Sequence, residues 1–240
     1  MSEETSGWIM HGLSREDPRR VRTPEQLIGR INAIGFLPLF SNSVPGFSVE
    51  EMTLGSDWWT GDERVDPWEW RRVLADGEQV AYGKFFDKKA GFISLDWLPR
   101  FANWRRDGYD FDALWDDQKA SFRQKKIMDL FSEREEWYSF DLKRKAGFGK
   151  GGEKNFEGVL TDLMMRTYLT VRDFRCRLNQ KGLPYGWHVA VYATPESIWG
   201  QERLSAAYGE KPEFSRDQVY RQVRACFPGA QDPQIRKILR

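Results

Sequence analysis

The sequence predicts an α+β fold that is mainly helical, and three observations lead to this prediction. Apolar residues recur at helical spacing in several segments, and residues that cap helices precede these segments. Two pairs of strand-like segments follow helical segments, and a turn separates the members of each pair. Apolar residues make up 40% of the 240-residue chain and charged residues 30%, so the chain can form a folded core.

The first helix is expected to begin after Thr23. Threonine is a favourable N-cap, Pro24 suits the first helical position, and Gln26 completes a capping box. Gly35 ends this helix, and the short apolar segment 36–40 follows. The apolar residues of the helix recur at helical spacing: Leu27, Ile28, Ile31 and Ile34.

The next part of the chain is expected to alternate between loops and short elements. A long loop that contains Asp57, Trp58 and Trp59 precedes a second helix. The expected elements are a loop at 41–67, a helix from 66 or 67 to 75, strands near 80–86 and 91–93, a helix at 97–105 capped by Ser94, and a turn at 105–112.

The order of elements is clearest in the second half of the chain. The expected segments are helices at 122–131, 140–145 and 153–166, with Ser139 as the cap of the second, a glycine-rich turn at 147–152, and strands at 168–177 and 185–193. Three helices followed by a β-hairpin is the order of a winged-helix domain. In such a domain the third helix can enter a major groove, and the hairpin can reach the backbone beside it.

These elements predict tandem winged-helix-like units with short β-hairpins. The expected divisions are an N-terminal tail at 1–22, a first unit with a loop-rich insertion at 23–110, a winged-helix domain at 111–195, and a C-terminal helical segment at 196–240.

Composition argues against several classes of protein. No apolar run is long enough to span a bilayer, and residues 1–12 do not resemble a secretory signal, so we expect a cytoplasmic protein with no membrane partner. The cysteines Cys176 and Cys226 are expected to be reduced and partly buried. His11 and His188 are the only histidines, and no metal-binding motif accompanies them, so neither a metal nor another cofactor is expected.

Basic residues concentrate in residues 139–177, with nine lysines and arginines against five acidic residues, although the whole chain carries a net charge of only +1. This bias points to phosphate contacts. The alternative is that these residues are solvated helix faces. The candidate DNA contacts, including one lysine in the expected hairpin turn, are Lys143, Arg144, Lys145, Lys150, Lys154, Arg166 and Lys181.

The expected third helix is a mediocre reader of DNA. Its outward face is expected to carry Lys154, Glu157, Thr161, Asp162, Met165 and Arg166. The two carboxylates on this face repel phosphate, and winged helices also serve as protein-interaction modules. A protein partner is therefore the alternative to DNA for this surface.

Two further motifs have a functional and a structural interpretation. The glycine-rich turn could bind phosphate through its amides, but no Lys-Ser or Lys-Thr follows it and it comes after a helix, so a flexible turn is favoured. Trp58 and Trp59 could stack on a base, or they could pack beneath the long loop.

The chain resembles the AlkZ-like (YcaQ-like) winged-helix family, which includes bacterial DNA glycosylases for alkylated and crosslinked bases. Residues 23–31 resemble the first helix of that family, and residues 36–40 resemble its catalytic strand, which carries a Gln-x-Asp or Gln-x-Gln pair. Residues 80–93 resemble a later conserved stretch, and residues 123–193 resemble its winged-helix modules. The resemblance implies a winged-helix fold and affinity for DNA.

The sequence departs from the family at the catalytic pair. Pro38 and Phe40 stand where the family has its glutamine and its aspartate or glutamine. Neither residue can position a water or accept a proton, so the resemblance implies DNA binding without the glycosylase chemistry. If a divergent glycosylase activity remains, a replacement carboxylate is expected among Glu50, Glu51, Asp57 and Asp87. A protein-interaction module or a transcriptional regulator is the other alternative.

Overall fold

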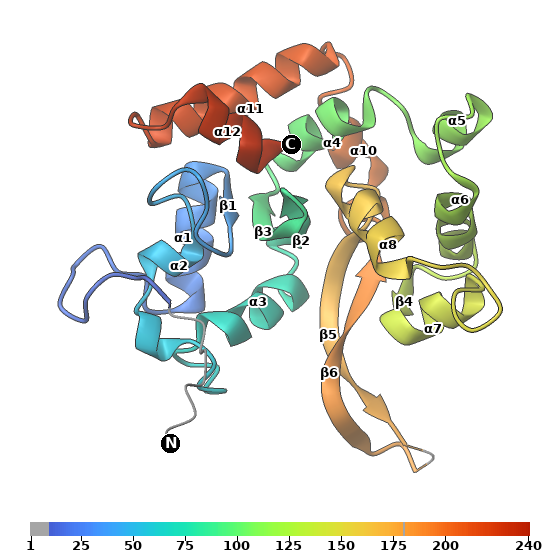
Figure 1. Cartoon of the computed structure of the whole chain (residues 1–240), viewed down its shortest axis with the longest axis horizontal. Coiled ribbons are helices and arrows are strands. Elements are labelled where there is room, and N and C mark those ends of the chain that lie inside the picture. The colour runs from blue at the N-terminus through green and yellow to red at the C-terminus, as the bar shows by residue number, and fades with distance from the viewer. Residues whose placement is uncertain (1–9, 180) are drawn as a thin grey trace, which may run out of the picture.

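A six-stranded antiparallel sheet runs through the centre of the molecule in the order β1-β3-β2-β5-β6-β4. The computed structural model describes residues 10–179 and 181–240, so residues 1–9 of the expected tail and Gln180 of the expected turn lie outside the described residues. Helices cover the sheet and form a separate layer at its upper end (Figure 1). The prediction of a mainly helical α+β fold is confirmed.

The strands and α-helices fall into two series with the same order, and only the 3-10 turns differ in their place. The first series is α1 (Pro24–Ile34), β1 (Phe36–Pro38), α2 (Val49–Met52), the 3-10 turn η1 (Gly55–Asp57), α3 (Pro67–Asp76), β2 (Val80–Phe86) and β3 (Lys89–Ser94). The linking helices are α4 (Leu98–Arg106) and α5 (Phe111–Asp116). The second series is α6 (Phe122–Met128), the 3-10 turn η2 (Asp129–Ser132), β4 (Glu136–Tyr138), α7 (Ser139–Lys145), α8 (Phe156–Met165), β5 (Thr170–Leu178) and β6 (Pro184–Ala193).

The two series also share their strand pairing. In each, the short first strand pairs antiparallel with the last strand of the hairpin, so β1 pairs with β3 and β4 pairs with β6. The series meet where Tyr82 of β2 pairs with Val171 of β5. The hydroxyl of Thr170, which is fully buried, donates to the Tyr82 carbonyl at 2.9 Å and ties the two halves of the sheet together.

The third helix of each series packs against the hairpin of the other. Helix α8 lies on β2, where the Lys84 ammonium donates to the Thr161 hydroxyl at 3.3 Å. Helix α3 lies on β5, where the Arg71 guanidinium is held between the rings of Trp68, at 3.7 Å, and Phe174, at 4.3 Å. This reciprocal packing buries helix surface that would otherwise face solvent.

Several local expectations need correction. Thr23 caps α1 as expected, but the Gln26 side chain accepts from the Arg22 amide, so the capping box is not closed. Ser94 is the last residue of β3 and does not cap α4, which begins after Trp97. Ser139 is the first residue of α7 and no side chain caps that helix. Thr161 was expected on an outward face but is only 6% exposed, because β2 covers it.

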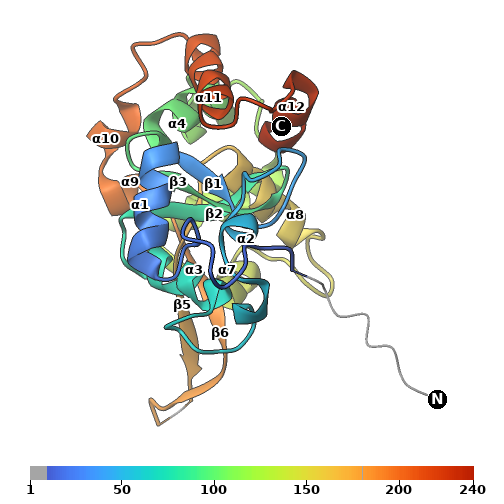
Figure 2. The same ribbon diagram turned by 90° about the vertical axis from the view of Figure 1, so that its left-hand side faces the viewer.

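The C-terminal helices are α9 (Pro195–Trp199), α10 (Gln201–Ser205), α11 (Pro212–Cys226) and α12 (Asp232–Leu239). Helices α11 and α12 form the layer above the sheet, whereas α9 and α10 lie lower, beside the sheet (Figure 2). Helix α4 holds α9 and the segment after α10 through the buried Arg106, whose guanidinium donates to the Thr167 carbonyl at 2.6 Å and to the Tyr208 hydroxyl at 3.2 Å. Arg106 also forms an ion pair with Glu196.

Candidate nucleic-acid interface

The β5–β6 hairpin projects from the sheet at the end opposite to α11 and α12 (Figures 1 and 2). Its last register pairs are Arg177 with Tyr185 and Leu178 with Pro184. The Asn179 side chain closes the turn, because its oxygen accepts from the amides of Lys181, at 2.8 Å, and Leu183, at 3.1 Å. These hydrogen bonds link Asn179 to Lys181 and Leu183 at the end of the hairpin.

The distal half of this hairpin is apolar and exposed. The described part of the chain has nine exposed large apolar side chains, and four of them lie here: Leu178, Leu183, Tyr185 and Trp187. Trp187 is 91% exposed, which is the largest value among the nine. Apolar surface gathered on a projecting element is typical of a binding surface, because water contact with it is unfavourable.

Charge on the hairpin is positive and differs between its base and its end. No aspartate or glutamate occurs between Asp173 and Glu196. At the base, carboxylates neutralise the arginines: Arg175 pairs with Asp173 at 2.5 Å and also with Glu136. Towards the end, Arg177 has no carboxylate partner among the described residues, and its guanidinium lies 4.5 Å from the Phe140 ring.

A hollow of about 360 Å³ lies beside the hairpin, between α7 and the glycine-rich turn. It brings together three of the predicted DNA contacts, Lys143, Arg144 and Lys150. Phe140 lines the hollow and also carries Arg177 on its ring, so the hollow and the hairpin form one continuous surface. Arg144 forms an ion pair with Asp141 at 2.7 Å, and Lys143 and Lys150 make no ion pair with any described residue.

Three amides of the glycine-rich turn donate within the turn. The Gly149 amide donates to the Glu153 carbonyl at 3.2 Å, the Gly152 amide to Gly149 at 3.1 Å, and the Glu153 amide to Gly147 at 2.9 Å. A Cβ on Gly152 would lie 2.2 Å from the Gly147 carbonyl oxygen, so glycine is required there. Amides that donate within the turn are not available to cradle a phosphate, which favours a structural role for these glycines.

The remaining basic candidates separate into two groups. Lys145, Lys154 and Lys181 are exposed, near α7, the glycine-rich turn and the hairpin end respectively. Arg166 follows the last residue of α8, so it lies about 15 Å along the helix axis from the glycine-rich turn. The Arg105 guanidinium binds the adjacent Met165 carbonyl at 2.9 Å, which places Arg166 beside α4. The structure therefore does not bring Arg166 to the surface formed by the others.

The two candidate stacking residues have different surroundings. Trp58 is 5% exposed, and its indole donates to the Thr53 hydroxyl at 2.9 Å. Its ring lies between those of Phe40, at 5.7 Å, and Trp59, at 6.0 Å. Packing accounts for Trp58, whereas Trp59 keeps 46% of its surface exposed.

The positions at which the family's catalytic pair was expected, Pro38 and Phe40, lie in an apolar part of the first series. Pro38 is buried at the end of β1, opposite Gly91 of β3. The Phe40 ring packs near Trp58 and Trp68. Neither side chain can bind a water or transfer a proton at these positions.

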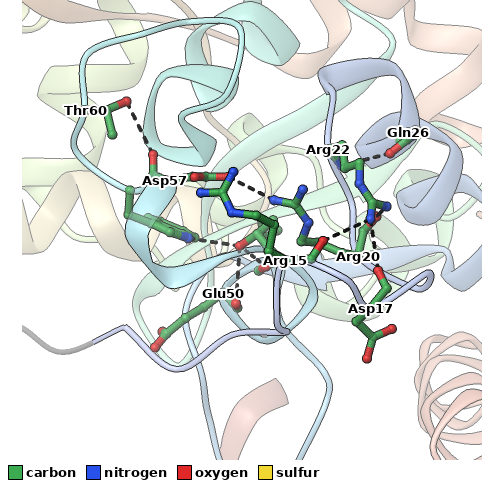
Figure 3. Close-up of polar contacts among 11 residues, drawn as sticks. Arg15, Asp17, Arg20, Arg22, Gln26, Glu50, Asp57 and Thr60 are labelled. Carbon is green, nitrogen blue, oxygen red and sulfur yellow. Dashed lines mark hydrogen bonds and ion pairs between the residues drawn. The ribbon is translucent and has the colours of Figure 1, made fainter.

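Two of the candidate carboxylates, Glu50 and Asp57, belong to a group of residues joined by polar contacts in the first series (Figure 3). The Glu50 side chain is buried, and its two oxygens accept from the amides of His11, at 3.2 Å, and Ser41, at 2.9 Å. The Asp57 carboxylate forms an ion pair with Arg20 at 3.1 Å. Both carboxylates therefore have structural partners.

The other two candidates are also engaged, but one of them faces a hollow. Glu51 accepts from the Gly46 amide at 2.8 Å and from the Ser48 hydroxyl at 2.6 Å, which fixes the loop before α2. Asp87 forms an ion pair with Arg240 at 2.8 Å and lines a hollow of about 330 Å³ that also contains Lys89. Asp87 is thus the candidate with the best access to a ligand.

Searches of the described residues give no support for a metal site or a membrane-spanning helix. No group of three or more His, Cys, Asp or Glu side chains in residues 10–179 and 181–240 could hold a metal ion. None of the helices in the same residues is both long and apolar enough to cross a membrane. Cys176 and Cys226 are free and half-buried, as expected.

Arg177 and Trp187 complete the surface but were not among the residues chosen from the sequence. The signal that could have identified them is the absence of carboxylates from residue 174 to 195, combined with bulky apolar residues around a turn. In a half-buried strand, every second side chain faces the core. These residues do not form such a buried face, because side chains on both faces of the distal hairpin are exposed.

Comparison with family models gives one finding. The model described as AlkZ related matches residues 21–240. Comparisons with curated proteins and with solved structures find no match.

Ion pairs at the hairpin base predict a dependence of stability on pH. The side-chain hydrogen bond from Arg175 lowers the pKa of Glu136, against an opposing effect of desolvation. A carboxylate with a lowered pKa stabilises the fold above its unfolded value of about 4.3 and loses that effect as the pH falls through the folded value. We expect the melting temperature of the unmodified protein to fall as the pH is lowered from about 5 to 3. In Glu136→Gln this fall is expected to be smaller.

The control for this measurement is Glu133→Gln. Glu133 is exposed and forms no ion pair with a described residue, so its replacement is expected to leave the pH profile unchanged. Identical profiles for Glu136→Gln and the unmodified protein would contradict the role given to Glu136.

Proposed function

Because the chain belongs to the AlkZ-related family, we propose that it is a DNA-binding protein built from two winged-helix units. In this proposal the second unit binds duplex DNA through the β5–β6 hairpin, α7 and the glycine-rich turn. The observation that carries the proposal is the exposed, carboxylate-free distal half of the hairpin.

The strand pairing supports the two winged-helix units. A winged-helix unit has a helix, a short strand, two helices and a hairpin, and here that order occurs twice. The pairing of the short strand with the second hairpin strand is also the same in both series. We accordingly propose units at 23–110 and 111–195, with β5–β6 as the wing of the second unit and 196–240 as an added helical segment.

The burial of α8 favours the wing over the third helix as the DNA contact. Within α8, all of which is described, the exposed side chains are Glu157 and Asp162, and both are acidic. The Thr161 face is covered by β2. A helix that exposes only carboxylates would repel a phosphate backbone, so it is unsuited to a major groove.

The chemistry of the wing suits a groove of duplex DNA. Arg177 and Lys181 can contact phosphates, which would add an electrostatic contribution that depends on salt. Trp187, Leu178 and Leu183 offer the kind of apolar surface that packs against sugars or inserts between base steps. Lys143, Lys145, Lys150 and Lys154 would extend the phosphate contacts along the backbone beside the wing.

The proposal does not include the base-excision chemistry of the related glycosylases. The side chains of Pro38 and Phe40 contain no acid or base. The four candidate carboxylates accept hydrogen bonds or form ion pairs within the fold. The second candidate function is a divergent glycosylase, and the specific observation in its favour is that Asp87 lines a hollow beside the loop after β1.

A protein partner is the remaining alternative, because the exposed apolar side chains of the wing could also dock on another protein. The two partners differ in their response to salt. Binding to DNA should weaken steeply as salt increases, whereas apolar docking should not.

The first test is fluorescence anisotropy with a labelled duplex at about 50 and 200 mM salt. We expect the affinity for DNA to fall as the salt concentration rises. In the triple variant Lys143→Ala, Lys150→Ala and Lys181→Ala, the slope of log affinity against log salt concentration should become shallower by roughly 0.9 for each lost phosphate contact. Trp187→Ala is expected to weaken binding by roughly 5- to 150-fold, since stacking contributes about 1–3 kcal/mol.

The matched control is Phe214→Ala, which removes another exposed aromatic side chain, on α11 at the end of the molecule opposite to the wing. It is expected to leave the affinity unchanged. Failure to bind at low salt, or binding that does not respond to salt, would contradict the proposal.

The second test measures base release from an alkylated oligonucleotide. We expect no release above the rate without protein. Asp87→Asn is the informative variant, because asparagine tolerates the positive φ of 47° at this position and removes only the charge. Release by the unmodified protein that is lost in Asp87→Asn would support the glycosylase alternative and would refute this part of the proposal.

If release is observed but survives Asp87→Asn, the remaining candidates are tested by Glu50→Gln, Glu51→Gln and Asp57→Asn. Base release by the unmodified protein, whichever variant abolishes it, would contradict our expectation that the protein has no glycosylase activity. The DNA-binding part of the proposal depends only on the anisotropy measurement.

A further inference from the structure

A second basic surface lies between α11 and α12, at the end of the molecule opposite to the wing (Figure 2). These helices enclose an open hollow of about 510 Å³. Four arginines line it: Arg216, Arg221, Arg224 and Arg236. Two aspartates and one tyrosine complete the lining, so each lining side chain carries a charged or polar group.

The aspartates neutralise only two of the four guanidinium groups. Arg224 donates twice to one oxygen of Asp232, at 3.0 and 2.7 Å. Arg216 donates twice to Asp217, at 3.1 and 3.0 Å.

The guanidinium groups of Arg221 and Arg236 form no ion pair or hydrogen bond with any residue that the structure describes. The hollow therefore has two uncompensated positive charges. Guanidinium groups in one hollow repel each other, so an anion bound there would relieve an unfavourable interaction.

Tyr220 lies on the same side of α11 and adds a hydrogen-bond donor. Its ring packs edge-on against Trp104, with 6.0 Å between centroids, and its hydroxyl makes no hydrogen bond to the described residues. Burial raises the pKa of Tyr220, against the opposing effect of nearby arginines. The phenol is therefore protonated at neutral pH and can donate to an anion.

We propose that this hollow binds a phosphate-bearing ligand, with Arg221 and Arg236 supplying the charge and Tyr220 a neutral donor. A phosphate monoester carries a charge near −2 at neutral pH, and a terminal diphosphate is more negative, so either matches the two free guanidinium groups better than one carboxylate does. Planar guanidinium groups can also donate two parallel hydrogen bonds to phosphate oxygens. The sources of this chemistry are a free nucleotide and a phosphorylated nucleic-acid strand.

The sequence contains the signal for this hollow. Residues 216, 220 and 224 are four apart, so they share one face of α11, and residues 217 and 221 flank that face. Arg236 comes from α12, which is brought alongside only by the fold. The site does not use the wing, so it can be present whether or not the wing binds DNA.

Isothermal titration calorimetry with inorganic pyrophosphate tests the proposal on the full chain. We expect saturable binding that weakens as salt increases, and a loss of roughly tenfold or more in affinity for Arg221→Gln with Arg236→Gln. Both residues are exposed, so the double variant is expected to fold, which its melting temperature without ligand would verify.

Arg203→Gln is the matched control, since Arg203 is exposed on α10 and forms no ion pair with a described residue. It should bind pyrophosphate as the unmodified protein does, and so should Trp187→Ala if this site is separate from the wing. No binding of pyrophosphate, or unchanged binding in the Arg221 and Arg236 double variant, would overturn the proposal.

Competition then identifies the source of the phosphate. Displacement of pyrophosphate by ADP but not by a 5′-phosphorylated oligothymidylate would assign a free nucleotide. Displacement by the oligonucleotide as well would assign a nucleic-acid strand. If neither ligand displaces pyrophosphate, the proposed recognition of a phosphate-bearing ligand is refuted.

Discussion

The edge-to-edge joining of two three-stranded sheets, between β2 and β5, is the constraint on which the rest of the structure depends. The backbone register here is short, so side chains carry much of the junction. The buried Thr170 hydroxyl binds the Tyr82 carbonyl, and Arg71 lies between Trp68 and Phe174. A buried hydrogen bond and a cation held between two aromatic faces are both costly to break, which fixes the two halves relative to each other.

This junction decides which surfaces can meet a ligand. Because α8 lies on β2 and α3 lies on β5, the third helix of each half is committed to internal packing. The β5–β6 hairpin extends beyond the junction (Figure 1), and four large apolar side chains of its distal half stay exposed. In our proposal the wing therefore takes over the role that a third helix has in other winged-helix proteins.

Local signals in the sequence were sufficient to predict most of the elements. The Thr23 cap and the apolar stripe of residues 156–164 depend on neighbours within one helix, and both predictions agree with the structure. Long-range packing could not be predicted in this way. Thr161 looked like a polar surface residue because its partner, Lys84, is 77 positions away in the sequence.

The candidate interface was predictable only in part, for the same reason. Lys143, Arg144 and Lys150 are near one another in sequence and share a hollow. Arg166 was grouped with them by charge alone, although α8 separates it from the hollow. Trp187 was missed because exposure is a property of the fold, and residues with the same composition could equally have formed a buried strand.

Hydrogen–deuterium exchange with and without duplex DNA tests the central claim most directly, since it reports which backbone segments DNA covers. The account predicts slower exchange in α7, in the glycine-rich turn and in the distal part of β5 and β6, with no change in α8. Slower exchange in α8 or α3, with the wing unaffected, would contradict it.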